Sequence, residues 1–108
     1  MPEPEIKWKR GELAEACGVN SETLRFYEKA GLLNPERGPN GYRLYGVNDA
    51  KRIRLALRAI GVGFSLLDVK AWFEGDSKKM EEALVRVGTK ITELERLRKS
   101  LRKKLKKA

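Results

Sequence analysis

Side chains that can hydrogen-bond to a nucleic acid are concentrated between residues 21 and 29 of this 108-residue chain. Arg25 carries a guanidinium group, which can hold a guanine edge through paired hydrogen bonds or bind a phosphate. Ser21 and Thr23 carry hydroxyl groups that can donate to phosphate oxygens, and a helix N-terminus there would add N–H donors. The same segment offers Glu22, Phe26 and Lys29 as further outward candidates. Alternatively, Arg25 pairs with Glu22 or Glu28 on its own helix, which stabilises a helix only slightly.

A second group of candidate contacts follows in a loop-rich segment. Asn40-Gly41 is a strong signal for a β-hairpin, and the aromatic alternation of residues 42–45 predicts its second strand. The first strand is predicted near residues 33–37. Arg37 and Arg43 would then contact phosphate, because a hairpin beside a DNA-reading helix can lie along the DNA backbone. Tyr42 belongs to this group, although it and Tyr45 could equally do no more than pack the hairpin.

Several kinds of chemistry are excluded by composition. The chain has no histidine and one cysteine, so His-containing triads, ordinary zinc sites and an internal disulfide framework are ruled out. A nucleophile with a paired base and a Gly-rich phosphate loop are also missing, so the sequence predicts a protein that is not an enzyme and needs no cofactor or metal. Cys17 is expected to be a buried structural residue. The composition favours a cytoplasmic protein without a membrane partner.

The first two predicted helices are short and form a helix-turn-helix. Leu13, Ala14 and Cys17 share one face of a helix that begins near Gly11, and Gly18 ends it. Asn20 or Ser21 caps the second helix. Leu24, Tyr27 and Ala30 lie on its inner face, so its other face can enter a DNA major groove. With the hairpin, this predicts a winged helix-turn-helix.

Two further helices are expected to complete the domain. Asn48 is predicted to cap the third helix, and Arg54 and Arg58 would add positive charge to it. Its buried stripe is predicted to consist of Ile53, Ala56, Leu57 and Ile60, with Gly61 at its end. Ser65 and Asp68 form a capping box for the fourth helix. The inward-facing residues of the fourth helix are expected to be Leu66, Val69, Trp72 and Phe73, before Gly75 closes it.

A long helix is predicted from about residue 78 to 107. Its apolar residues recur at intervals of three or four positions, which makes a narrow seam typical of a coiled coil. The predicted seam consists of Leu84, Val87, Ile91, Leu94, Leu97, Leu101 and Leu105. A helix of this length exceeds what a small domain can cover, so a second copy of the chain is the simplest partner. Alternatively, the segment folds back or is partly disordered.

Most of the net charge of +9 lies at the C-terminal end. Residues 96–107 hold eight of the 24 basic residues and none of the 15 acidic ones, which leaves a net charge of +1 elsewhere. This basic tail could bind nucleic acid or an anionic membrane surface. It could also be a solvated helix end, where cations suit the helix dipole.

The chain resembles the MerR family of bacterial transcription regulators. The runs that carry the resemblance are CGVNSETLRFYEKAGLL (17–33), GYRLYG (41–46) and GFSLLDVKAWF (63–73), and their order and spacing match over residues 11–75. The resemblance implies a winged helix-turn-helix whose dimers form through an antiparallel coiled coil. It further implies binding to promoters with long spacers, which are bent and untwisted so that RNA polymerase can engage them.

By this resemblance, the positions that match the family's DNA contacts are Arg25 and Tyr27 in the second helix and Tyr42 and Arg43 in the hairpin. The hydroxyl of Tyr27 is expected to reach phosphate while its ring packs. One departure is Arg10, which stands where the family usually has an apolar residue before the Gly-Glu-Leu-Ala start. No effector site is visible in this chain, and the residues do not identify an effector.

Together these observations predict a mostly α fold with three segments. Residues 1–5 are expected to be a flexible N-terminus, 6–75 the winged helix-turn-helix with its small two-stranded wing, and 78–108 a coiled-coil dimerisation helix with a basic tail. The predicted function is that of a homodimeric, sequence-specific regulator that binds double-stranded DNA at the bacterial or archaeal nucleoid. The alternatives are an architectural or recombination-directionality DNA binder and an interaction module whose basic tail docks on an acidic partner.

Overall fold

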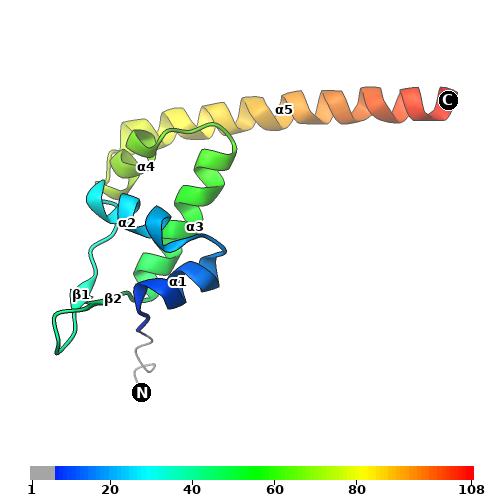
Figure 1. The fold of residues 1–108 in the computed structure, drawn as a ribbon. Helices are drawn as coiled ribbons and strands as arrows, with labels where there is room; N and C mark the ends of the chain where they lie inside the picture. The colour runs from blue at the N-terminus through cyan, green and yellow to red at the C-terminus, as the bar shows by residue number, and fades with distance from the viewer. Residues whose placement is uncertain (1–6) are drawn as a thin grey trace, which may run out of the picture. The chain divides into compact units, whose positions relative to one another are not determined.

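The computed structural model describes residues 7–108, so the expected flexible N-terminus at 1–5 lies outside the described residues. The elements in chain order are α1 (Arg10–Cys17), α2 (Ser21–Lys29), β1 (Glu36–Arg37), β2 (Arg43–Leu44), α3 (Val47–Gly61), α4 (Leu66–Phe73) and α5 (Ser77–Lys107) (Figure 1). The chain divides into two compact units at the boundary between Phe73 and Glu74. We call residues 7–73 the head. The predicted mostly α fold with a two-stranded wing is confirmed.

Local sequence signals set the ends of α1 and α2. Gly18 follows α1 with φ of 71°, a left-handed conformation that glycine adopts without strain. Asn20 is the N-cap of α2, because its side-chain oxygen accepts the backbone N–H of Thr23 at 2.8 Å. Of the two predicted cap residues, Asn20 is therefore the cap and Ser21 is the first helical residue.

The wing is shorter than expected. Glu36 pairs with Leu44 and Arg37 with Arg43, and residues 33–35 are not part of the strand. A β-turn joins the strands, in which the N–H of Gly41 donates to the carbonyl of Gly38 at 2.9 Å. Within the Asn40-Gly41 pair, φ is positive for Gly41 but not for Asn40. This is a three-residue hairpin loop with glycine in the left-handed position.

Residues before α1 brace the wing. The N–H of Trp8 donates to the carbonyl of Tyr45, and the N–H of Tyr45 donates to the carbonyl of Trp8, each at 2.8 Å. This pair of bonds holds Trp8 in an extended conformation beside the wing. It also places the start of α1 directly beside the second strand of the wing.

The start and inner face of α3 differ from the prediction. Gly46 is the N-cap, and the carboxylate of Asp49 accepts the backbone N–H of Gly46 at 2.9 Å. Asn48 is therefore not the cap, because it lies inside the first turn. Ile60 is 39% exposed and Leu57 is half-buried, whereas Ala50 and Ala59 are buried with Ile53 and Ala56. The buried face of α3 is therefore centred on alanines, whose small side chains allow the helix to pack closely against its neighbours.

The fourth helix begins as predicted. The N–H of Ser65 donates to the Asp68 carboxylate, and the N–H of Asp68 donates to the Ser65 hydroxyl, which confirms the capping box. Val69 is buried in α4, whereas Leu66, Trp72 and Phe73 are half-buried.

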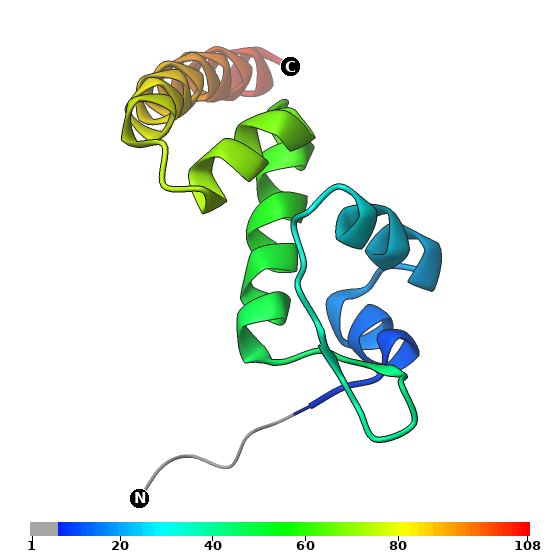
Figure 2. The same ribbon diagram turned by 90° about the vertical axis from the view of Figure 1, so that its left-hand side faces the viewer.

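The core of the head lies where the helices meet. In the head, α1 packs against α2 and α3, and α3 packs against α4, while the wing projects beyond the helices (Figure 2). The largest fully buried side chains are Tyr45, Leu13, Leu24, Leu32, Ile53 and Val69. Each leucine buried in this way stabilises the fold by roughly 1.5–3 kcal/mol. This core fixes α2 with one face inward and leaves its other face at the surface.

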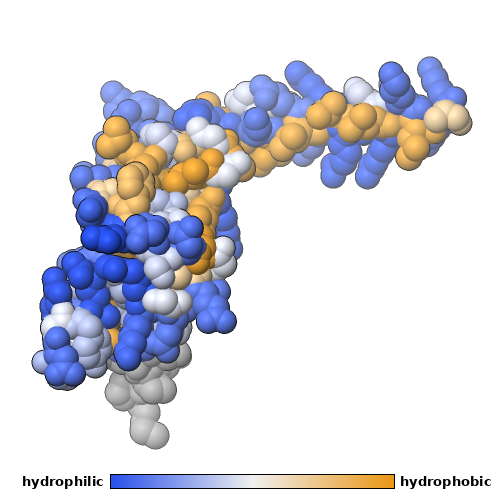
Figure 3. Space-filling view, in the orientation of Figure 1, coloured by the Kyte–Doolittle hydropathy of each residue, from blue (hydrophilic) through white to orange (hydrophobic). Residues whose placement is uncertain are grey.

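The second unit is one helix. Asp76 caps α5 by accepting the backbone N–H of Lys79 at 3.1 Å, and the helix extends for 31 residues, about 46 Å. None of its side chains is buried. A band of hydrophobic residues follows its length between charged residues (Figure 3). Within residues 7–108, no helix is both long enough and apolar enough to cross a membrane.

Candidate nucleic-acid interface

The outer face of α2 carries most of the side chains predicted to contact DNA. Ser21, Arg25, Phe26 and Lys29 are exposed, and Phe26 is exposed by 59%. Arg25 lies 4.0 Å from the Glu22 carboxylate, and both side chains are more than half exposed. Such a loose pair contributes little to stability, so the guanidinium can turn to another ligand at small cost.

Thr23 and Tyr27 take part in the fold as well. The hydroxyl of Thr23 is 3.0 Å from the side-chain oxygen of Asn20 and donates to it, which reinforces the cap of α2. Tyr27 is only 6% exposed, and burial raises the pKa of its phenol. Its ring centroid lies 6.2 Å from that of Phe26. The tyrosine is therefore mainly a core residue with its edge near the surface.

Beside α2 there is an open hollow of about 470 Å³. It is lined by Asn20, Glu22, Thr23, Phe26, Tyr27, Ile60 and Leu66. The exposure of Ile60, which sequence periodicity placed in the core, is explained by this hollow between α2, α3 and α4. Phe26 and Ile60 give it an apolar wall next to the polar first turn of α2.

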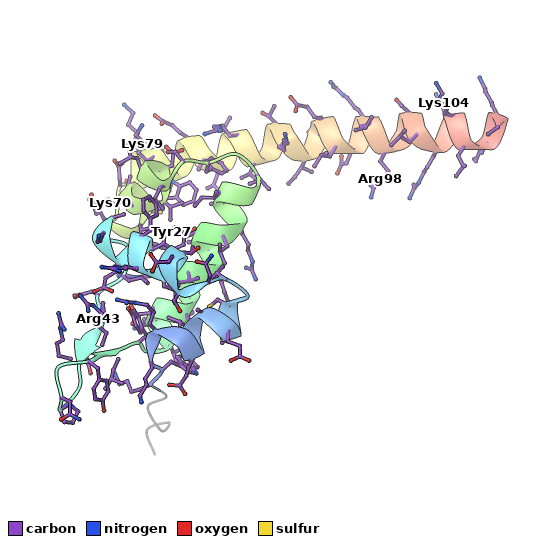
Figure 4. The ribbon with its side chains drawn as sticks, in the orientation of Figure 1. Tyr27, Arg43, Lys70, Lys79, Arg98 and Lys104 are labelled. Atoms are coloured by element: carbon purple, nitrogen blue, oxygen red, sulfur yellow. The ribbon has the colours of Figure 1, made fainter. Side chains whose placement is uncertain are left out.

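The predicted wing residues have three different environments. Arg37 is exposed and donates through Nη1 to the carbonyl of Gly41 at 2.7 Å, within its own hairpin. Tyr42 is 40% exposed, and the Lys9 ammonium lies 5.6 Å from the centre of its ring. Arg43 is half-buried at the base of the wing, where it pairs with Glu28 of α2 (Figure 4).

Glu28 of α2 bonds to both α1 and the wing, whereas sequence reasoning considered it only as a partner for Arg25. Its carboxylate accepts hydrogen bonds from Arg43 Nε, from Arg10 Nη2 at 3.1 Å and from the Tyr45 hydroxyl at 2.9 Å. Arg10 Nε also donates to the Tyr45 hydroxyl at 3.2 Å. Because the donors come from α1, β2 and the residue after β2, this cluster links α2 to α1 and to the wing.

The electrostatics of the cluster follow from these contacts. Burial alone would raise the pKa of Glu28, but the hydrogen bonds from Arg43, Tyr45 and Arg10 outweigh it, so the net pKa is lowered. The hydrogen bond to Tyr45 raises the pKa of Arg10. Burial raises the pKa of the Tyr45 phenol. Near neutral pH the cluster therefore consists of one carboxylate, two guanidinium groups and one neutral phenol.

The sequence contained one hint of this cluster: Arg10 stands where an apolar residue was expected before the start of α1. The partners of Glu28 lie 15 to 18 positions away from it. No helical or strand periodicity links residues at such separations.

Two other basic residues and the single cysteine lie outside this cluster. Arg54 and Arg58 are exposed on α3. Cys17 is half-buried, and burial raises the pKa of its thiol despite the opposing charge of Arg54. A raised pKa makes a thiol less reactive, which fits a packing residue. Among the residues described, no three His, Cys, Asp or Glu side chains are grouped closely enough to hold a metal ion.

The predicted seam lies along one face of α5 and is exposed in a single chain. The exposed fractions rise from 39% at Val87 to about half at Ile91, Leu94 and Leu97, and to 76% at Leu105. Leu84 and Leu101 complete the seam, at 70% and 58%. A stripe of this extent is unusual on a helix without a partner.

Comparison with known proteins places these features in a family. The sequence profile described as MerR family regulatory protein matches residues 11–45, which hold α1, α2 and the wing. The HTH-type transcriptional regulator HmrR of Rhizobium leguminosarum bv. viciae is 38% identical over 89 residues, which are 80% of this chain and 69% of HmrR. The chain belongs to the MerR family.

Other members of the MerR family show the same relation. The mercuric resistance operon regulatory protein of Bacillus cereus is 43% identical over 65 residues, which are 59% of this chain and 49% of that protein. The chain thus spans between about half and two-thirds of the length of these relatives. A MerR-family regulator of Bacillus thuringiensis has the same fold, with a TM-score of 0.72 at 23% identity over 95% of this chain and all of that one.

A further MerR-family structure includes nucleic acid. HiNmlR, a regulator lacking the sensor domain, was crystallised bound to promoter DNA, and it matches with a TM-score of 0.57 and 25% identity over 80% of this chain and 79% of that chain. The relatives are transcription regulators, so the regulatory interpretation is favoured over the architectural alternative. The protein is accordingly a MerR-type transcriptional regulator.

Proposed function

We propose that this protein binds promoter DNA as a homodimer and regulates transcription by distorting that DNA. The observation that carries the proposal is the capped helix α2, whose exposed hydroxyl, guanidinium and ammonium groups lie beside a wing. The resemblance to HiNmlR, which is bound to promoter DNA, supports it. A helix held in this way by its neighbours can enter a major groove without further rearrangement.

Each predicted contact has a proposed role that follows from its surroundings. Arg25 is proposed to read a base, because its ion pair with Glu22 is long and exposed and leaves the guanidinium available. Phe26 offers an apolar surface of the kind that contacts a thymine methyl group. The proposed phosphate contacts are Ser21, Thr23, Tyr27, Lys29, Arg37, Tyr42 and Arg43. Within this group, the burial of Tyr27 limits it to a contact through its hydroxyl.

Dimerisation is proposed to occur through α5 over residues 78–108, while residues 6–75 form the DNA-binding domain. Burying the seam would remove from water the apolar side chains that a single chain leaves exposed. An antiparallel arrangement is favoured by charge. A parallel pair would place the two basic tails, each with eight positive residues, side by side.

The proposed mode of action follows from the geometry of such a dimer. In a dimer the two α2 helices would contact two half-sites, and a spacer that does not fit them would have to be bent or untwisted. RNA polymerase would then engage the distorted promoter. We place this activity in the cytoplasm, at the nucleoid of the host cell, and we propose no catalytic step.

Selection of bound sequences from a random DNA pool tests the proposal. The enriched sites are expected to contain two inverted half-sites, and light scattering is expected to show two chains per DNA duplex. Enrichment of no common sequence, or binding by a single chain, would refute it. If enriched sites map to recombination or nucleoid-packing sites and not to promoters, the regulatory role is wrong although DNA binding is right.

A further inference from the structure

A second hollow, of about 410 Å³, lies between the start of α1 and the wing. It is lined by Lys9, Arg10, Tyr42 and Arg43. Three of these four side chains are cationic, and the fourth presents a phenol. We propose that this hollow binds a DNA backbone phosphate, so that the start of α1 and the wing contact the same phosphate. This inference rests on the proposed function and adds a site to it.

The hollow is built by the fold and not by chance proximity of flexible chains. The paired backbone bonds between Trp8 and Tyr45 place residues 9 and 10 beside the second wing strand. Glu28 then fixes the two arginines, because its carboxylate accepts Nη2 of Arg10 and Nε of Arg43. Two cationic groups are therefore held in place before any ligand arrives, which lowers the cost of binding.

Donor groups are left over for a ligand. A guanidinium has five N–H groups, and the hydrogen bonds described here use the Nε and Nη2 nitrogens of Arg10 and the Nε nitrogen of Arg43. Nη1 of Arg10 and both Nη nitrogens of Arg43 can thus donate elsewhere. The exposed Lys9 ammonium adds three more donors beside the Tyr42 ring.

The charge of the hollow favours an anion. Among the described residues, Lys9, Arg10 and Arg43 contribute three positive charges, and Glu28 and Glu12 contribute two negative charges, so the site keeps a positive charge. The nearby Glu12 carboxylate accepts the backbone N–H of Lys9, and Lys7 pairs with Glu36 at 3.1 Å. A phosphodiester, with one negative charge and two acceptor oxygens, suits such a set of donors.

The test measures DNA affinity of the full chain against salt concentration. Lys9→Ala removes an exposed side chain and is expected to leave the fold intact. Arg10→Lys keeps the positive charge but replaces the guanidinium, with its several N–H donors in one plane, by an ammonium group. Losing one phosphate contact lowers the magnitude of the slope of log K against log salt by about 0.9. The ratio of wild-type to Lys9→Ala affinity should therefore shrink by about 3.5-fold between 50 and 200 mM salt. Lys90→Ala, an exposed charge removal on α5 outside the seam, is the matched control.

Phosphate ethylation interference locates the contact. Ethylation of one phosphate per half-site is expected to weaken wild-type binding, and to weaken the binding of Lys9→Ala and Arg10→Lys by a smaller factor at that phosphate. An unchanged salt slope for Lys9→Ala, or equal ethylation effects at every phosphate in all three proteins, overturns the site while leaving the proposed function intact. Failure of the wild type to bind any DNA overturns both. If sodium phosphate weakens DNA binding more than sodium chloride of equal ionic strength, and only when Lys9 is present, free phosphate and DNA compete for the hollow, which supports the site; the same excess effect of phosphate on wild type and Lys9→Ala places the competition elsewhere and overturns it.

Discussion

Glu28→Ala should lower the free energy of unfolding of the head more than alanine substitution of any other charged residue in α2. The carboxylate is 17% exposed and accepts three hydrogen bonds, two of them from guanidinium groups. A hydrogen bond contributes about 0.5–1.5 kcal/mol net. The guanidinium groups of Arg10 and Arg43 are 28% and 37% exposed and can regain water, so the lower part of that range applies.

The expected loss in the free energy of unfolding is therefore about 2 kcal/mol. For a unit of this size it corresponds to a fall in melting temperature of roughly 8–16 °C. Tryptophan fluorescence at fixed protein concentration measures it, because Trp8 and Trp72 both lie in the head. Glu22→Ala is the control, since its carboxylate is 81% exposed and 4.0 Å from Arg25. Its melting temperature should change by less than about 4 °C.

The same variant has a characteristic pH dependence. The pKa of Glu28 is lowered in the folded protein, so the stability that it provides is complete above the ordinary glutamate pKa of about 4.3. That contribution is lost as the pH falls through the lower pKa of the folded state. The difference in melting temperature between wild type and Glu28→Ala should thus be constant near neutral pH and narrow below about pH 4. Equal melting temperatures for Glu28→Ala and Glu22→Ala at pH 7, or a gap that widens in acid, would refute the reasoning.

Three further outcomes are expected. Leu94→Ala removes about three methyl or methylene groups per chain from a side chain that is 54% exposed in a single chain. The dimer should therefore lose about 2.4 kcal/mol over both copies, and its Kd, measured by analytical ultracentrifugation, should rise about 50-fold. Glu93→Ala lies off the seam and should leave the Kd unchanged; equal Kd values for the two variants would mean that the seam is misassigned. Asn20→Ala removes the cap bond to the Thr23 N–H and should lower the melting temperature of the head by about 4–8 °C, whereas an unchanged value would exclude a stabilising cap. Arg25→Ala should weaken operator binding by about 1–3 kcal/mol in an electrophoretic shift assay and relax the preference at one base pair. A uniform loss over all sequences would instead assign Arg25 to phosphate.

Much of the fold could be predicted because its signals are local. Gly18, Asn20 and the Ser65–Asp68 pair act within three or four residues of themselves, so a short stretch of sequence contains the whole interaction. The same is true of the seam on α5, since its spacing follows from helical periodicity alone. The cap predicted at Asn48 was wrong, because the carboxylate of Asp49 accepts the N–H of Gly46 and the helix starts two residues earlier.

The sequence by itself determined that a helix-turn-helix, a hairpin and a long amphipathic helix would form, and that α2 would present basic and hydroxyl groups. Only the tertiary structure decided which charges are paired. Glu28 receives Arg10 and Arg43 because the packing of α1, α2 and the wing brings together residues that are 15 to 18 positions apart. It also decided that Ile60 is exposed while Ala50 and Ala59 are buried on α3, because burial depends on which elements cover a helix and not only on the periodicity of the helix itself. Interactions of this kind depend on the relative placement of whole elements, and no short window of sequence contains that information.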